Sequence, residues 1–591
     1  MTLKINNRTV AVQAGQTILE VARASGIRLP SLCYHPDLEV KANCRVCVVE
    51  IAGRAKLMTA CSTEVEDGME ILTDSPRVKR ARAVNLELIL SEHTKKCAAC
   101  LAFPDCELLR LERVYKVDSD RLAPRKSGRK TYRFAGAVEI DGEQCLDCDN
   151  CITACHHQGI DYLRLAGAGA AQEIVPVKDK EKSCIYCGQC AAHCPSASAQ
   201  EQSAWPAVEK ALQDKQKIVI AQFAPAVRVS LGEEFGLPYG TNCEGLIYTA
   251  LKKLGFNNVI DINFGADITT MTEAEELMER LRAKKAVWPM FTSCCPAWVA
   301  YAEFYHPELL PHLTAARSPH IHSAGALKTY WAQKNRIDPR KITVVSIVPC
   351  TAKKYEATRS ELSLNGRPLV DYVLTTRELA YLIKKQDIDF KKLTPSDGDK
   401  LFNRGSGAAA IYGASGGVME SALRSAAVFA CRDATGAKNE KSFNQKNFDQ
   451  KNSDKKGFSK TSLVCAERLE FKDVRGLTGF KEAIVDIAGR KLKVGVVNGI
   501  GNFRRVLPKL KKYHYIEVMA CPGGCLGGGG QPIPTTDAIR KKRLEGLYDI
   551  DKGRAVRRAH ENKAMVEYYD WAKKQDLSAK VLKTKFKKTH P

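Results

Sequence analysis

The sequence lacks any long apolar stretch. It contains no run of about 18 apolar residues, the length at which a helix begins to be able to cross a membrane. The first sixteen residues, MTLKINNRTVAVQAGQ, alternate between polar and apolar and do not resemble the apolar core of a secretory signal peptide. We therefore expect a protein of the cytoplasm with no membrane span.

Acidic residues are few relative to basic ones. The chain has 67 Asp and Glu against 91 Lys and Arg, a formal charge of +24. Such an excess can indicate nucleic-acid binding, but no nucleic-acid motif occurs. The stretch NGIGN, 498–502, lacks the third glycine of a dinucleotide fingerprint. The basic excess is interpreted either as a solvated surface or as a docking face for an acidic electron carrier.

Cysteine, by contrast, is abundant, with 23 in 591 residues. Disulfides are rare in cytosolic proteins, whereas closely spaced cysteines indicate metal ligands. Nineteen of the 23 fall into short-spaced groups or into three later motifs. Cys243, Cys431 and Cys465 remain and are interpreted as structural thiols, and Cys294 is treated separately below. A chain of this length is expected to form three to five domains.

The first group predicts a 2Fe–2S ferredoxin-like domain over residues 1–77. Its cysteines are separated by ten, two and thirteen residues, within short strands and turns, and they are Cys33, Cys44, Cys47 and Cys61. The plant-type ferredoxin pattern is C-x4-C-x2-C…C. The central pair and the distant fourth ligand match this pattern, and the first gap is longer. A zinc site is the alternative.

A second group, within residues 78–118, has only three cysteines. A helical pattern over 77–93 leads into HTKKCAACLAFPDC, which contains His93, Cys97, Cys100 and Cys106. A 4Fe–4S cube needs four ligands, so the imidazole of His93 is predicted to be the fourth. The alternative is a surface histidine at a helix end.

Two further runs, within residues 136–204, have the bacterial ferredoxin spacing C-x2-C-x2-C-x3-C. The first run consists of Cys145, Cys148, Cys151 and Cys155. The second consists of Cys184, Cys187, Cys190 and Cys194, followed by Pro195. In two-cluster ferredoxins the fourth cysteine of each run binds the other cluster. Cys194 is therefore expected to complete the first cube and Cys155 the second.

From about residue 205 the pattern becomes α/β. Apolar runs at 217–223, 341–348, 491–498 and 515–520 predict strands separated by helices. Three turns carry the remaining cysteines, and they read FTSCCPAW (291–298), VPCTAKKYE (348–356) and EVMACPGGCLGGGGQP (517–532). Ligands of open α/β folds bind at the carboxyl ends of strands. Together these turns offer four thiolates and one additional cysteine.

These three stretches resemble the signature motifs TSCCPxW, MPCxxKxxE and ExMACxxGCxxGGGQP of the iron-only (FeFe) hydrogenases, and the N-terminal cysteine pattern is similar to that of the larger members. The resemblance covers essentially all of 1–591, with Val348 in place of the usual Met. It implies a multidomain α+β protein: a plant-type ferredoxin-like domain, a small His/Cys cluster domain, a two-cluster ferredoxin domain and a catalytic domain over 205–570. A polar segment at 433–460 is expected to be a disordered insert, and 571–591 to be a basic tail.

The resemblance also implies an H-cluster, which is a 4Fe–4S cube joined to a diiron unit with CO, CN and a dithiolate. Its ligands would be Cys295, Cys350, Cys521 and Cys525. The glycines after Cys525 would let the backbone approach the cluster closely. Lys353 would donate to one cyanide, and the pocket would be lined by Ala224, Pro225, Ser318, Pro319 and Met519.

Proton transfer is implied for five further residues. Cys294 would exchange protons near neutral pH, since an ordinary thiol has a pKa of about 8.5, and Glu273, Thr314, Glu276 and Arg280 would extend the path. A capping box from Thr272 to Glu275 predicts that a helix begins there. On pattern alone the charged residues of this helix would form a solvated, salt-bridged face.

The implied activity is 2H⁺ + 2e⁻ ⇌ H₂, with one 2Fe–2S and three accessory 4Fe–4S clusters relaying electrons. Expected partners are ferredoxin or another acidic carrier, an NAD(P)-binding subunit and the proteins that mature the H-cluster. Two alternatives are a respiratory-type subunit that only conducts electrons and a hydrogen sensor with little turnover. The three C-terminal motifs argue against the first, and the absence of a recognisable signalling domain argues against the second.

Overall fold

The computed structural model describes residues 1–399, 402, 405–435 and 470–589. The chain divides into two compact units, Met1–Lys182 with Gln189–Gln202, and Ser183–Gly188 with Ser203–Pro591. Most of the predicted insert at 433–460, and Cys465, lie outside the described residues. None of the described helices is both long and apolar enough to cross a membrane.

The first unit begins with a five-stranded sheet in the order β2-β1-β5-β3-β4. In β1 the alternate residues Leu3 and Ile5 are buried, as expected for a strand with one face on the core. Helix α1 (Ile18–Ala24) starts at a capping box of Thr17 and Glu20 and buries its apolar side chains under the sheet. The strands are β1 (Thr2–Ile5), β2 (Arg8–Ala11), β3 (Val48–Ile51), β4 (Met58–Thr59) and β5 (Glu70–Leu72).

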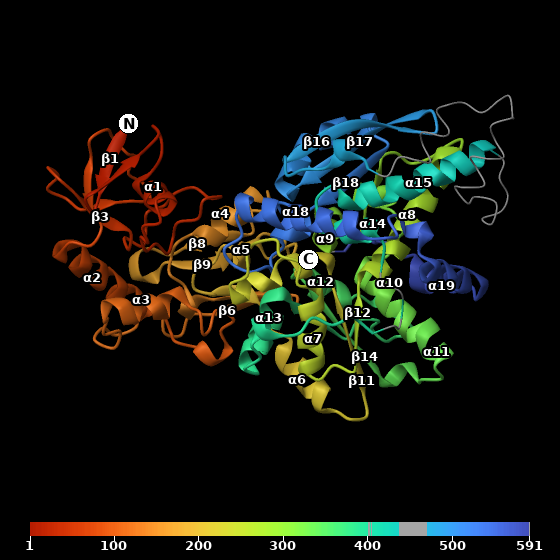
Figure 1. Cartoon of the computed structure of the whole chain (residues 1–591), viewed down its shortest axis with the longest axis horizontal. Coiled ribbons are helices and arrows are strands. Elements are labelled where there is room, and N and C mark those ends of the chain that lie inside the picture. Colours follow the sequence, from red (N-terminus) through yellow and green to blue (C-terminus); the bar gives the residue numbers. More distant parts are fainter. Residues whose placement is uncertain (400–401, 403–404, 436–469, 590–591) are drawn as a thin grey trace. The chain divides into compact units, whose positions relative to one another are not determined.

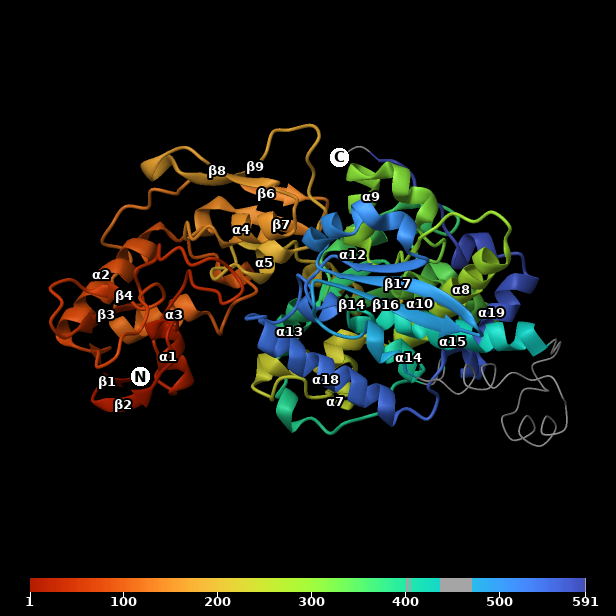
Figure 2. The same cartoon turned by 90° about the horizontal axis from the view of Figure 1, so that it is seen from above.

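The rest of the first unit is built from short elements around cysteine loops. The helix predicted at 77–93 is confirmed as α2 (Pro76–Glu92), with Ser75 as its N-cap and Pro76 at its first position. Figure 2 shows α4 and α5 side by side next to β7. The remaining elements are α3 (Glu107–Tyr115), β6 (Thr131–Phe134), β7 (Val138–Asp141), α4 (Asn150–His157), β8 (Leu163–Ala166), β9 (Glu173–Pro176), α5 (Gln189–Ala192) and β10 (Ala199–Glu201).

The second unit contains a four-stranded parallel sheet in the order β12-β11-β14-β15. Every residue of β14 is buried, as expected for a strand inside a parallel sheet covered on both faces. The runs predicted as strands at 217–223 and 341–348 are both confirmed. The strands are β11 (Ile218–Phe223), β12 (Asn258–Asp261), β14 (Ile342–Val348) and β15 (Tyr372–Thr375).

A second four-stranded sheet has the order β13-β18-β17-β16 and is mixed. β18 runs parallel to β13 and β17, whereas the β16–β17 pair is an antiparallel hairpin. The runs predicted at 491–498 and 515–520 are confirmed. The strands are β13 (Met290–Phe291), β16 (Phe480–Ile487), β17 (Arg490–Asn498) and β18 (Tyr515–Met519).

The central helix of this unit is α8 (Asn263–Arg282), which packs against α10 (Pro319–Ala326) and α15 (Gly417–Thr435). Figure 1 shows α15 beside the β16–β18 strands. The predicted helix start at Thr272 is wrong. Thr272 lies inside α8, where its hydroxyl bonds to the carbonyl of Ile268 one turn earlier, so the capping-box pattern arose within a continuing helix.

Other helices complete the second unit. The predicted boundary at residue 571 falls inside α19, and the chain beyond it returns to the unit, because Val581 and Leu582 are buried. The helices are α6 (Trp205–Gln213), α7 (Glu244–Lys253), α9 (Pro296–Tyr305), α11 (Ala332–Lys334), α12 (Ala352–Ala357), α13 (Thr376–Lys385), α14 (Gly407–Ala410), α18 (Asp537–Gly553) and α19 (Lys563–Lys574).

Candidate active site and cluster-binding sites

The three C-terminal cysteine motifs meet at one cavity in the second unit. Each follows the carboxyl end of a strand, namely β13, β14 or β18. Four predicted ligands line the cavity, Cys295, Cys350, Cys521 and Cys525, together with Cys294 and Lys353. The sheets therefore bring together residues that are more than 200 positions apart in the sequence.

The four predicted ligands are near enough to perturb one another electrostatically. Burial raises the pKa of Cys350 to about 12, and the neighbouring Cys295 contributes in the same direction. Burial also raises the pKa of Cys521 and Cys525, with added contributions from the other two thiols. A thiolate at any one position is thus disfavoured in the protein alone, and a positively charged iron core would reverse that balance.

The glycines after Cys525 allow the backbones of two ligand loops to touch. A Cβ on Gly528 would lie 2.1 Å from the carbonyl oxygen of Pro349, which immediately precedes Cys350. Gly524 has φ of +70° and packs against the backbone of Ser415. The run of glycines therefore serves contact between protein loops, in addition to the predicted approach to a cluster.

Lys353 is buried, although lysine side chains usually extend into solvent. Its Nζ donates to Glu356 Oε2 at 2.7 Å and to the carbonyl oxygen of Cys294 at 3.1 Å. His320 Nε2 lies 2.7 Å from the same carboxylate oxygen. Although burial lowers the pKa of Lys353, Glu356 and Cys350 raise it overall. The cavity wall thus carries a fixed cation.

Four of the five residues predicted to line the pocket do so, and they are Ala224, Pro225, Pro319 and Met519. The fifth, Ser318, is not in the lining and is the N-cap residue of α10. Its Oγ is buried and has no hydrogen-bond partner among the described residues. Val348, where the family motif has Met, also lines the cavity.

Cys294 is buried beside Glu273 in the second unit. Burial, and then the charge of Glu273, raise the pKa of Cys294 well above its ordinary value. The expectation of a thiol with an ordinary pKa is therefore wrong, because desolvation disfavours the thiolate. Cys294 is a neutral thiol that keeps its proton at neutral pH.

Glu273 is fully buried, so it is not part of a solvated helix face. The hydroxyl of Tyr515 donates to Glu273 Oε2 at 3.0 Å. Glu273 Oε1 has no hydrogen-bond partner among the described residues. Burial raises the pKa of Glu273 to about 8, and the nearby Glu276 contributes. This carboxyl group can hold or release a proton near neutral pH.

Glu276, Thr314 and Arg280 form a directly bonded group. The Thr314 hydroxyl donates to Glu276 Oε2 at 2.7 Å, and Arg280 Nη2 donates to Oε1 at 2.6 Å. The side chains of Glu276 and Arg280 are each 13 % exposed, so this group lies between the buried Glu273 and the surface. Among the described residues, no hydrogen bond joins Glu273 to Thr314.

Three residues of this site were not identified from the sequence. Tyr412 and His320 line the cavity, and Tyr515 binds Glu273. The hydroxyl of Tyr412 lies 2.9 Å from Thr270 Oγ1. Tyr412 sits in a run of small residues, GAAAIYGASGG, and this density of glycine and alanine was the available signal.

In the first unit, the four cysteines of the ferredoxin-like domain are all buried. They lie as two adjacent pairs, Cys33 with Cys44 and Cys47 with Cys61, and within each pair one thiol shifts the pKa of the other. The structure thus brings together the four predicted 2Fe–2S ligands despite the long first gap.

His93 and its three cysteines line a small cavity in the first unit. His93 Nδ1 lies 3.1 Å from the carbonyl oxygen of Gln144, which fixes the tautomer with a bare Nε2. Burial lowers the pKa of His93 and so favours the neutral imidazole that can bind iron. This geometry fits the predicted ligand better than the alternative of a surface histidine.

Cys194, the last cysteine of the second run, lies close to the cysteines of the first run. The charges of Cys145, Cys148 and Cys194 each raise the pKa of Cys151, after the larger effect of burial. Cys155 and Cys190 also belong to the first unit, whereas Cys184 and Cys187 belong to the second.

The short segment 183–188 is anchored to the second unit near the cavity. Tyr186 packs against the rings of Phe304 and Tyr355, and its carbonyl oxygen accepts a bond of 2.7 Å from the Thr351 hydroxyl. The carbonyl oxygen of Cys187 lies 3.8 Å from Cys521 Sγ. A predicted relay ligand is therefore in contact with a predicted ligand of the cavity.

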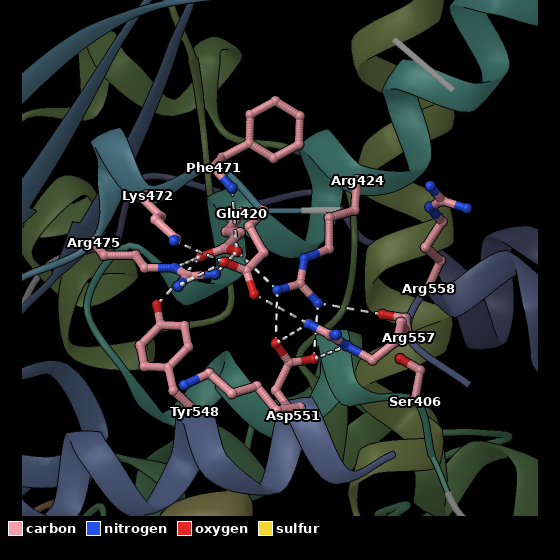
Figure 3. Close-up of polar contacts among 12 residues, drawn as sticks. Ser406, Glu420, Arg424, Phe471, Lys472, Arg475, Tyr548, Asp551, Arg557 and Arg558 are labelled. Atoms are coloured by element: carbon pink, nitrogen blue, oxygen red, sulfur yellow. Dashed lines mark hydrogen bonds and ion pairs between the residues drawn. The ribbon is translucent and has the colours of Figure 1, made fainter. Parts of the chain in front are cut away.

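A buried ion network supports the second unit away from the cavity (Figure 3). Arg424 on α15 donates to Glu420 at 2.8 Å and to both oxygens of Asp551 on α18. Arg475 and Arg557 bind the outer sides of the same two carboxylates. The network ties the helix before residues 436–469 to the segment after them and to α18.

Comparison with known proteins gives three family matches. Residues 217–529 match the iron only hydrogenase large subunit, C-terminal domain; residues 1–76 match the 2Fe-2S iron-sulfur cluster binding domain; and residues 537–589 match the iron hydrogenase small subunit. The first match covers more than half of the chain.

The chain is similar along its length to two curated proteins. It is 39 % identical to the NADP-reducing hydrogenase subunit HndD of Solidesulfovibrio fructosivorans, over 96 % of this chain and 95 % of that one. It is 38 % identical to iron hydrogenase 1 of Clostridium pasteurianum, over 96 % of both. The chain is also similar to a solved structure of HydA(deltaEFG), which concerns stepwise assembly of the [FeFe]-hydrogenase H-cluster. The TM-score is 0.52 and the identity 32 %, over 65 % of this chain and 99 % of that one.

Proposed function

We propose that this chain, which belongs to the iron-only (FeFe) hydrogenase family and is an oxidoreductase acting on H₂, performs its reaction in the cavity lined by Cys295, Cys350, Cys521 and Cys525. The reaction is 2H⁺ + 2e⁻ ⇌ H₂. The single observation that carries this assignment is the convergence of four thiols from three distant loops on one cavity.

The donor set fits an H-cluster. Four thiols match a 4Fe–4S cube, since iron–sulfur clusters are held by cysteine thiolates. When bound, the diiron part of this cofactor would supply the redox and acid–base chemistry of H₂. Lys353 would place a positive charge beside an anionic ligand of that group. Ser318 Oγ, buried without a protein partner among the described residues, offers another polar contact nearby.

The protein's own part in catalysis is proton delivery. Cys294 lines the cavity and would hold a proton next to the reacting atoms. Glu273, whose charge acts on Cys294, would accept and return that proton, because a carboxyl with a pKa near 8 can do both at neutral pH. Thr314, Glu276 and Arg280 would carry the path outward, with a water or a side-chain rotation joining Glu273 to Thr314.

Electrons would reach the cavity through the accessory clusters. We assign one 2Fe–2S cluster to the first domain, a His93-ligated cube to the second, and two cubes to the paired ferredoxin runs. Segment 183–188 carries Cys184 and Cys187 and contacts Cys521. It would hold the accessory cluster nearest to the cavity. The family matches thus support the coarse assignment of iron–sulfur clusters and an H-cluster, and the individual ligands remain our proposal.

The electron partner is proposed to be an acidic carrier such as ferredoxin or an NAD(P)-binding subunit. The second choice is supported by the similarity to HndD, a subunit of an NADP-reducing hydrogenase. The chain itself has no complete dinucleotide fingerprint at 498–502. Pull-down of the tagged chain from its source cell tests this choice, because a stable NAD(P)-binding subunit would co-purify whereas a soluble ferredoxin would dissociate.

The assignment is tested by producing the chain together with the hydrogenase maturation proteins. We expect H₂ evolution from reduced viologen and infrared bands of bound CO and CN. A protein that carries the bands and does not turn over would support the sensor alternative. A protein with iron and sulfide but without the bands would contradict the assignment of this cavity.

A further inference from the structure

The loop between Cys33 and Cys44 is longer than the corresponding loop of the plant-type ferredoxin pattern. Ten residues separate these cysteines, against four in the plant-type ferredoxin pattern. In the first unit this loop reaches the two-cluster segment at three points. Glu39 Oε1 lies 2.9 Å from His157 Nε2, Asn43 donates to the carbonyl oxygen of Asp147, and the ring of His35 contacts that of His193. The extra residues thus serve to join two cluster domains.

Three metal-binding groups meet at this junction. Ligand atoms of His35, Asp37 and His193 all lie within 4.8 Å of one another. The two imidazole rings have centroids 4.4 Å apart and an interplanar angle of 66°. Two imidazoles with one carboxylate form a donor set that binds zinc and other divalent first-row metals. None of these residues belongs to the predicted cluster ligands.

The surroundings of His193 favour metal binding. Its Nδ1 lies 2.7 Å from the carbonyl oxygen of Gln189, so Nδ1 carries the ring proton and Nε2 is the nitrogen that would act as the ligand. A backbone carbonyl on the far nitrogen is the arrangement that usually orients a metal-bound histidine. His35 is buried, and its Nδ1 accepts a bond of 3.2 Å from the backbone N–H of Asp37. Binding through His35 Nε2 would move the ring proton to Nδ1 and give up this long contact.

We propose that His35, Asp37 and His193 bind one divalent cation of the zinc class, with water completing a tetrahedral site. Metal–ligand bonds of about 2.0–2.1 Å place tetrahedral ligand atoms roughly 3.4 Å apart, so the side chains would close by little more than an ångström. The cation would fasten the loop that begins at Cys33 to the segment that ends at Cys194. It would therefore hold the 2Fe–2S ligand loop against the first cube's ligand loop.

The test uses the full-length protein with its iron–sulfur clusters. The protein is dialysed with Zn²⁺, freed of excess metal, and measured for zinc, iron and sulfide. X-ray absorption at the zinc edge then distinguishes nitrogen and oxygen ligands from sulfur, which separates this site from zinc misplaced in a cluster site. We expect one zinc per chain with nitrogen and oxygen ligands only.

The variants His193→Ala and Asp37→Asn should each weaken zinc binding at least tenfold. His157→Ala is the matched control, because it removes the neighbouring Glu39 contact and leaves the three ligands in place. Asp37→Asn keeps the test decisive if His193→Ala loses iron, since Asp37 lies farther along the sequence from any predicted cluster ligand. Zinc well below one equivalent, sulfur coordination, or equal zinc in wild type and Asp37→Asn would overturn the proposal.

Discussion

The two units of the molecule assemble their cysteine sites in opposite ways. In the first unit, Cys145, Cys148 and Cys151 lie within seven consecutive residues, so a single turn of chain presents three ligands. In the second unit, Cys295 and Cys525 belong to loops that only the fold brings together. The comparison teaches that local spacing defines the relay sites, whereas the catalytic cavity depends on two intact sheets.

This difference has a physical basis in chain entropy. Closing a loop of a few residues around a cluster costs little, and the cost of bringing distant segments together must be met by burial elsewhere. The parallel strands β11 and β14 and the mixed strands β17 and β18 supply that burial. A cysteine site of the first unit should therefore still form when the second unit is damaged. In the cavity, no cysteine nearby in the sequence should be able to take over the role of a lost one.

The sharpest test replaces one ligand from each class. Cys350→Ser should remove the infrared CO and CN bands and lower H₂ evolution by about 10³-fold or more, equivalent to ~4 kcal/mol at 1.36 kcal/mol per tenfold. Cys97→Ser, in the relay, should retain the bands and lose less viologen-driven activity. Equal loss of bands in both variants would show that the relay and the cavity are not assembled independently.

Stability of the catalytic unit can be changed without touching a cysteine. Arg424→Met removes the cation that the buried carboxylates of Glu420 and Asp551 share. Arg475 and Arg557 still bind one carboxylate each, so the cost should be near the lower end of the range for a broken buried pair, about 3 kcal/mol. We expect a lower melting temperature for the second unit. The transition is measured by circular dichroism in the near ultraviolet. The visible spectrum of the first unit's clusters should persist above that transition. Loss of both signals in a single step would contradict the independence of the units.

Proton delivery can be separated from cluster assembly at Glu273. Glu273→Gln removes the titrating group but keeps its shape and its contact with Tyr515, so turnover should fall by about 10²-fold, within the range typical of a general acid–base group. The infrared bands should remain, since no cluster ligand changes. Glu275→Gln, on the same helix but outside the relay, is the control and should keep its activity. An unchanged rate in Glu273→Gln would remove this residue from the path.

Glu273 should also make the protein's stability depend on pH. Its pKa is about 8 in the folded protein and 4.5 in an ordinary glutamate, so between these values the folded state holds a proton that the unfolded state has lost. Stability should therefore decrease as pH rises through this window, by up to ~1.4 kcal/mol per pH unit from this group. Denaturant melts at pH 6 and pH 8 should differ less in Glu273→Gln than in the wild type. The same difference in both proteins would assign the effect to other groups.

The smallest expected effect is at Thr314. Thr314→Ser keeps the hydroxyl that donates to Glu276, and should change the rate by less than about twofold, whereas Thr314→Val loses a hydrogen bond to a charged group and should slow turnover by about tenfold, near the ~1.5 kcal/mol such a bond contributes. Thr314→Val exchanges the hydroxyl of threonine for a methyl group of similar size, whereas Thr314→Ser keeps the hydroxyl and removes the methyl group. Equal rates in the two variants would mean that protons bypass this residue.

Much of the fold could be predicted from local patterns. The strands ending before Cys350 and Cys521 were found because buried strands of a sheet are continuous apolar runs, and α2 was found from its periodicity. The start of α8 was misjudged at Thr272, because a threonine followed three residues later by glutamate also occurs inside a helix. Burial, which decides between these cases, is a tertiary property.

The candidate site shows the same division. The cysteines of the motifs could be predicted from the sequence pattern. Lys353 and Glu273 could be predicted from the family resemblance. Tyr412, His320 and Tyr515 could not, because they stand in no motif. They reach the site through the packing of α10, β18 and the short helical turn Ile411–Gly413, which contacts α15. The pKa of Cys294 was also misjudged, since it depends on how much water the fold excludes.

The sequence alone determined which residues are candidate soft metal ligands and how they group, because covalent spacing sets which thiols one turn of chain can present to a cluster. Tertiary structure decided which distant loops share a cavity, which acids stay protonated and where His35 meets His193. Those outcomes depend on desolvation and on side-chain packing between segments far apart in the chain. Neither quantity is a function of local spacing.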